Sequence, residues 1–117
     1  MNMHKSEEGT DVLAFISDLD GGELERKMSL ALSRVAAATV DNDRVGEVDV
    51  RFIFKRIAGT NQVHVQHLLK FTKPTMNGKA SEEETRSTPM HVGKFGRLTL
   101  APESQIDMFK SGEPAKL

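Results

Sequence analysis

The chain has 117 residues, a length that is typical of one domain with a single modest core. Its net charge of −1 at pH 7 gives it no global attraction to nucleic acid or to anionic lipid. The absence of cysteine excludes disulfides and thiolate zinc sites, and no apolar run reaches the about 18–20 residues of a membrane-spanning helix. The first residues lack the apolar core of a signal peptide, so we expect a protein of the bacterial cytoplasm.

The N-terminal third predicts one main helix after a polar start. Residues 1–10 are polar, and we expect a flexible N-terminus there; the apolar run at 12–16 is too short to distinguish a helical turn from an edge strand. Asp20, with Glu23 three residues later, is typical of a helix N-cap with a capping box. Apolar residues then recur at helical spacing over residues 21–39, which predicts a helix that covers one face of a sheet. The apolar stripe of this helix consists of Leu24, Met28, Ala31, Val35 and Ala38.

Residues 46–72 hold the clearest pattern, two alternating segments that fold back on one another around Gly59. Apolar residues fall on even positions in the first segment and on odd positions in the second, which is the period of half-buried strands. A loop at 58–61 pairs the apolar residues as Phe54 with Val65, Phe52 with His67, Val50 with Leu69 and Val48 with Phe71. The opposite face then pairs Lys55 with His64, Arg51 with Leu68 and Asp49 with Lys70. A slip of one residue would move every apolar side chain to the other face, so this register is strongly specified.

The remainder of the chain shows less periodicity. Residues 73–88 have no apolar alternation, and we predict a mobile loop there. A second hairpin follows, from residues 90–92 through a turn at 93–96 to residues 97–100. The fold class is therefore α+β: one main N-terminal helix packed on a small antiparallel sheet of three to four strands built from two hairpins. We expect a single domain over residues 11–103 and a C-terminal tail over residues 104–117.

No constellation of catalytic or metal-binding residues is evident. His64 and His67 lie three apart on one strand, so they point to opposite faces and cannot share a metal ion, and His67 is expected in the core. No serine lies in a Gly-x-Ser-x-Gly elbow, and the carboxylates fall in segments where solvent would surround them. We therefore expect no catalytic residue, no metal and no cofactor, and a protein that is not an enzyme.

The outward face of the first hairpin is the remaining candidate for a binding surface. Its residues are Arg51, Ile53, Lys55, His64, Gln66, Leu68 and Lys70. We add Lys94 and Phe95 at the second turn, which lacks the spacing and the following helix of a phosphate-binding loop. This surface suits a protein partner, and its basic residues leave nucleic-acid binding as an alternative. One helix covers only one face of such a sheet, so we also expect its exposed face and unpaired edges to associate with a partner or with a second copy as a homodimer.

Several segments of the chain resemble small uncharacterised accessory proteins encoded by temperate bacteriophages and prophages. The residues that carry the resemblance are 15–22, 73–75, 78–79, 88–90, 92–94, 96, 98–99 and 102–103. The resemblance implies a protein that acts inside an infected or lysogenic bacterium and binds a host or phage macromolecular complex. One class of such targets is host defence machinery such as CRISPR effectors, which the protein would inhibit. No activity is carried to any single residue.

Overall fold

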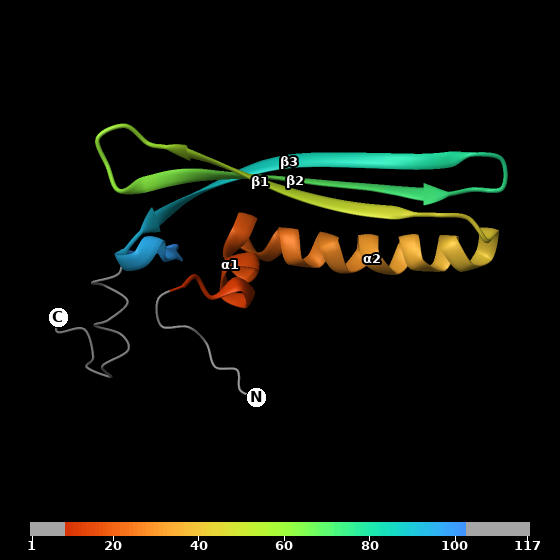
Figure 1. Cartoon of the computed structure of the whole chain (residues 1–117), viewed down its shortest axis with the longest axis horizontal. Helices are drawn as coiled ribbons and strands as arrows, with labels where there is room; N and C mark the ends of the chain where they lie inside the picture. Colours follow the sequence, from red (N-terminus) through yellow and green to blue (C-terminus); the bar gives the residue numbers. More distant parts are fainter. Residues whose placement is uncertain (1–8, 103–117) are drawn as a thin grey trace, which may run out of the picture.

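The computed structural model describes residues 9–102, which form a helical N-terminal region and a four-stranded antiparallel sheet (Figure 1). In chain order the elements are α1 (Val12–Asp18), the 3₁₀ helix η1 (Leu19–Gly22), α2 (Glu23–Asn42), β1 (Glu47–Arg56), β2 (Gln62–Pro74), β3 (Lys79–Val92), the 3₁₀ helix η2 (Lys94–Gly96) and β4 (Leu98–Thr99). The strands neighbour one another in the order β1-β2-β3-β4. The predicted α+β class is confirmed. The predicted flexible N-terminus, residues 1–10, lies outside the described residues except for residues 9 and 10, and the predicted tail, residues 104–117, lies wholly outside them.

The predicted pairing of the first hairpin is confirmed residue by residue. Phe54 lies opposite Val65, Phe52 opposite His67, and Lys55 opposite His64. The same register continues from Glu47 opposite Thr72 to Arg56 opposite Val63. Burial explains why alternation alone was sufficient: Val65, His67 and Leu69 are buried on the helix side, while Gln66 is exposed and Leu68 half-buried on the other face.

The predicted mobile loop over residues 73–88 is wrong. Lys73 and Pro74 complete β2, a turn over residues 75–78 is closed by a hydrogen bond from the Thr75 N–H to the Gly78 carbonyl (2.9 Å), and β3 begins at Lys79. In β3 charged and hydroxyl residues occupy both faces over most of its length, so apolar alternation does not mark it as a strand. The strand is instead specified by its pairing with β2, which extends over all thirteen residues of β2. The predicted second hairpin is present, although β4 has only two residues.

The helix predicted over residues 21–39 is confirmed as α2, but the predicted capping box is wrong. Asp20 adopts a left-handed backbone (φ +52°), whereas an N-cap residue adopts an extended one, and Gly22 is the N-cap of α2. The Asp20 N–H donates to Thr88 Oγ1 on β3 (2.9 Å), and Glu23 pairs with Arg26 within the helix (2.7 Å). Only α1 has a side-chain cap among the helices described here, because Asp11 Oδ1 accepts from the Ala14 N–H (3.2 Å).

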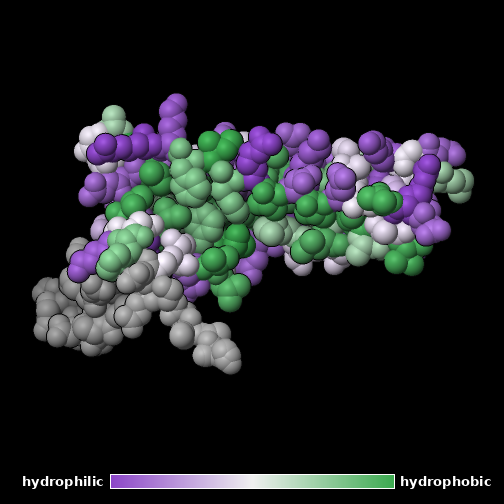
Figure 2. Space-filling view, viewed as in Figure 1, coloured by the Kyte–Doolittle hydropathy of each residue, from purple (hydrophilic) through white to green (hydrophobic). Residues whose placement is uncertain are grey.

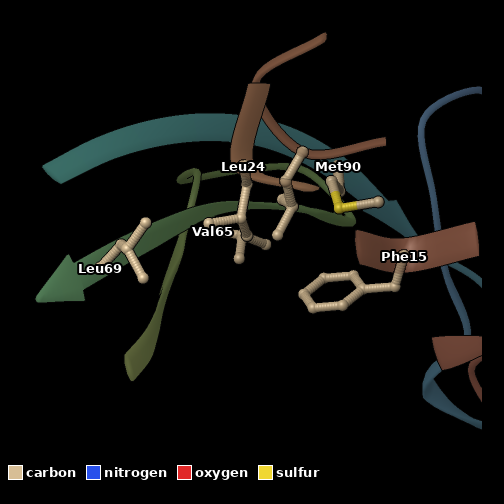
Figure 3. Packing of buried hydrophobic residues seen from close by; sticks show 6 residues of the cluster. Phe15, Leu24, Val65, Leu69 and Met90 are labelled. Carbon is tan, nitrogen blue, oxygen red and sulfur yellow. The ribbon is translucent and has the colours of Figure 1, made fainter. Parts of the chain in front are cut away.

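The core lies where α1, η1 and the start of α2 meet the sheet (Figure 3). Phe15, Leu24, Val65, Leu69 and Met90 converge there from two helices and two strands, together with the fully buried Leu19. The Phe15 ring meets the ring of Phe52 edge to face, with 5.1 Å between centroids, a geometry that aromatic pairs favour. The core thus ties the N-terminal helices to three strands, and it leaves the opposite face of the sheet without a cover from the described residues.

Candidate functional site

The face of the sheet that points away from α2, which we call the outer face, brings the predicted binding residues together. The register places them in rows across three strands: Lys55–His64–Pro89, Ile53–Gln66–Ser87, Arg51–Leu68–Thr85 and Asp49–Lys70–Glu83. All the predicted members are exposed except Leu68, which is half-buried. Ile53 keeps 43% of its surface exposed beside Gln66, so the centre of this face combines an apolar side chain with an amide.

The charges on the outer face are mixed. Lys70 lies between Asp49 and Glu83 in one row, so two carboxylates flank one ammonium group. Arg51 and Lys55 form the basic end of the face. A nucleic-acid site concentrates cations along a phosphate track, whereas a protein interface surrounds an apolar centre with charges of both signs. The outer face therefore matches a protein interface better than a phosphate-binding one.

Lys94 and Phe95 are not part of the outer face. They lie in η2, on the same side of the sheet as the helices (Figure 1). Hydrogen bonds from Arg97 to the Gly9 carbonyl (3.3 Å) and from the Leu98 N–H to Thr10 Oγ1 (3.2 Å) hold this end of the chain against the segment that precedes α1. Phe95 remains 70% exposed in a left-handed conformation (φ +59°). The predicted binding surface therefore combined residues of the outer face with a turn that lies on the helix side of the sheet.

A polar cluster between α2 and β3 escaped prediction from the sequence. Lys27 Nζ contacts both carboxylate oxygens of Glu84 at 2.6 Å, and Arg86 approaches Glu84 (3.0 Å) and Asp20 (3.7 Å). The hydrogen bond from Lys27 lowers the pKa of Glu84. The cluster borders an open groove of about 310 Å³, which Leu30, Arg34 and Phe71 also line. The only local signal is the run Glu82-Glu83-Glu84-Thr85-Arg86, which is charged and polar throughout and shows no apolar alternation.

His67 lies beside this cluster and is buried, as the alternation predicted. It is 3% exposed, and its Nδ1 has no hydrogen-bond partner among the residues described. Burial lowers the pKa of His67, because the interior disfavours the imidazolium form. His64 is exposed on the other face, so the two histidines are separated by the sheet. Within residues 9–102, no group of three or more metal-ligating side chains is arranged to hold an ion.

The fold and the outer face define a small α+β protein: a helix packed on one side of a four-stranded antiparallel meander whose other side is open to solvent. Residues 11–98 match the YfdP family, and the chain belongs to this family. A relative from Escherichia coli (strain K12), described as "Uncharacterized protein YfdP", is 40% identical over 110 residues, which cover 93% of this chain and 91% of the relative. No solved structure matches the chain. In the described part of the chain, no helix is both long and apolar enough to span a membrane.

Proposed function

We propose that the protein is a non-enzymatic accessory protein that uses the outer face of its sheet to bind and modulate a macromolecular complex, most directly through a protein subunit. The observation that carries the proposal is the composition of this face. Ile53 and Gln66 lie near its centre, Arg51 and Lys55 lie in the rows on either side, and Asp49 and Glu83 flank Lys70 one row beyond Arg51. Interfaces of this kind place apolar contacts at the centre and charged groups at the rim.

The resemblance to temperate-phage accessory proteins supports a narrower form of the proposal. In that form, the complex belongs to the host or the phage, and a host defence complex such as a CRISPR effector is one candidate target that the protein would inhibit. The setting would be the cytoplasm of an infected or lysogenic bacterium. The family membership is compatible with this form and adds no activity to it.

Affinity capture tests the class of partner. The tagged full-length protein is used to capture complexes from bacterial lysate, with and without nuclease, and the bound proteins are identified by mass spectrometry. We expect one protein complex to remain bound after nuclease treatment. Loss of capture after nuclease would instead favour nucleic acid, and purified protein would then bind duplex DNA with a log–log salt slope near −0.9 per phosphate contact.

A further inference from the structure

The two long edges of the sheet differ in how they discourage pairing. At one edge of the sheet, β3 carries three consecutive glutamates, Glu82 to Glu84, and Pro89. On the side of β3 that faces away from β2, β4 covers only His91 and Val92. Charges and proline are the usual means by which proteins protect an exposed strand edge. β1 has no proline and no run of three like charges; five of its ten residues are apolar, and the other five are charged, with both signs represented. No other strand within residues 9–102 pairs with its free edge.

An apolar surface adjoins the free edge of β1. Phe54 is 51% exposed at one end of the strand, and Leu32 is 54% exposed on α2, which contacts β1. Ile16, Met28 and Leu32 line an open groove beside α2. Figure 2 shows hydrophobic residues gathered over α1 and continuing as a band along α2 and the sheet. Exposed apolar side chains next to an unpaired strand edge are typical of an interface.

The backbone of β1 offers regular hydrogen-bonding groups at this edge. The Ile57 N–H donates to the Gln62 carbonyl (2.9 Å), which identifies the odd-numbered residues of β1 as those that bond to β2. Antiparallel strands alternate in the direction of their backbone groups, so the even-numbered residues from Val48 to Arg56 point their N–H and carbonyl groups away from β2. A second strand can therefore pair with β1 without disturbing β2.

We propose that the protein forms a symmetric homodimer in which β1 pairs antiparallel with β1 of a second copy, centred on Phe52. This register pairs nine residues, Val48 to Arg56, with their symmetry copies. It places Asp49 of each copy opposite Lys55 of the other. Each residue that points to the outer face then lies opposite a residue of the second copy that also points to the outer face. The proposal does not depend on what the outer face binds.

Alternative symmetric registers of β1 are less favourable. Centring on Arg51 also pairs nine residues, but it places Arg51 opposite its own copy. Centring on Ile53 places Arg51 opposite Lys55, and centring on Val50 or Ile53 pairs only seven of the ten residues of the strand. Like charges directly opposite one another destabilise a strand pair. The centre at Phe52 therefore combines the longest overlap with charge complementarity.

The position of α2 leaves space for this arrangement. Both copies of α2 would lie on the same side of an eight-stranded sheet, and each α2 packs mainly over its own β2. Three strand spacings would separate the two copies of β2 by roughly 14 Å, which exceeds the roughly 10–12 Å diameter of a helix with its side chains. Phe52, Phe54 and Leu32 of both copies would occupy the intervening space and become buried.

A charge-swap cycle tests the register by sedimentation equilibrium of the purified full-length protein. We expect the wild type to be a dimer, Lys55→Glu to raise the dimer Kd roughly ten-fold or more, and Asp49→Lys to weaken the dimer as well. The double variant Asp49→Lys, Lys55→Glu restores opposite charges only across the proposed interface, so it should dimerise more tightly than Asp49→Lys alone. A monomeric wild type, assembly beyond the dimer, or a double variant without this rescue would overturn the proposal.

A backbone variant provides an independent test at the same edge. Phe54→Pro removes an N–H that points away from β2, so it leaves the β1–β2 hydrogen bonds intact, while Phe54→Ala removes the same ring and keeps the N–H. We expect Phe54→Pro to be a folded monomer by circular dichroism and sedimentation, and Phe54→Ala to retain a measurable dimer. Equal dimerisation of the two variants would overturn the proposal, and the charge-swap cycle stands if the proline variant fails to fold.

Discussion

Substitution of Gly46 by alanine provides a direct test of how closely α2 approaches the start of β1. A Cβ atom at residue 46 would lie 2.6 Å from Val35 Cγ1, 2.7 Å from Thr39 Oγ1 and 3.2 Å from Pro74 Cδ. Optimal carbon–carbon contacts lie at about 3.5–4.0 Å, so the neighbours would have to move by roughly 1 Å. Val35 is buried and β-branched, and Thr39 Oγ1 donates to the Val35 carbonyl (2.7 Å), so neither side chain can rotate away freely.

The expected cost follows from these contacts. Overpacking of this kind costs about 1–3 kcal/mol, and the lower unfolded-state entropy of alanine returns about 0.4–1 kcal/mol. A net loss of about 1–2 kcal/mol lowers the Tm of a domain of this size by roughly 4–16 °C. The assay is thermal unfolding followed by circular dichroism at 222 nm.

A matched control is available in the turn between β2 and β3. A Cβ at Gly78 would meet only Thr75 Oγ1, at 4.0 Å, so Gly78→Ala should change the Tm by no more than a few degrees. If Gly46→Ala were as stable as the wild type, or if both variants lost the same stability, the close approach of α2 to β1 would be refuted.

Three further predictions concern the core and the polar cluster. Burial lowers the pKa of His67 below its ordinary 6.5, so on acidification the unfolded chain binds the proton before the folded protein does. The contribution of His67 to the free energy of unfolding should therefore be fully present above pH 6.5, and it should fall below that pH by at most about 1.4 kcal/mol per pH unit. His67→Leu should remove this dependence in urea titrations between about pH 5 and 8. Leu69→Ala, at a buried position, should cost about 2–5 kcal/mol in the same titrations, against less for Leu68→Ala on the outer face; equal costs would contradict the assignment of the two faces. Lys27→Ala should lower the free energy of unfolding by less than about 1 kcal/mol, because the side chains of Lys27 and Glu84 remain 28% and 30% exposed. A loss above about 2 kcal/mol would show that the ion pair is more strongly coupled than this exposure indicates.

The parts of the fold that were predictable are those in which burial produces a period. Phe52, Val65 and Leu69 alternate because one face of β1 and β2 meets the helices, and this alternation was sufficient to predict the register. β3 escaped prediction because its helix side carries Glu84 and Arg86, which are stabilised by ion pairs with residues distant in the sequence. Such tertiary contacts have no local signature.

The Asp20 cap and the hairpin tip show a second limit. The N-cap prediction at Asp20 is wrong because Asp20, Gly21 and Gly22 all adopt left-handed conformations, so α2 begins after Gly22. Lys94 and Phe95 are predicted as an extension of the outer face at the second turn, but the sequence does not specify on which side of the sheet this turn lies. The outer-face residues of β1 and β2 were found correctly because they share one register.

The central claim is that the outer face of the sheet is the surface that binds a partner, and capture by matched variants tests it most directly. His64→Glu with Gln66→Glu adds two carboxylates to the central strand of this face, away from the free edge of β1. Met76→Glu with Asn77→Glu adds the same charge change in the exposed turn between β2 and β3. Both variants are first shown to be folded, and the complex captured by wild type from nuclease-treated lysate is then quantified for each.

The account predicts that the His64, Gln66 variant loses most of the captured complex, while the Met76, Asn77 variant captures as much as the wild type. Equal capture by all three proteins would contradict the assignment of the outer face. Loss with the turn variant alone would place the contact at the β2–β3 turn.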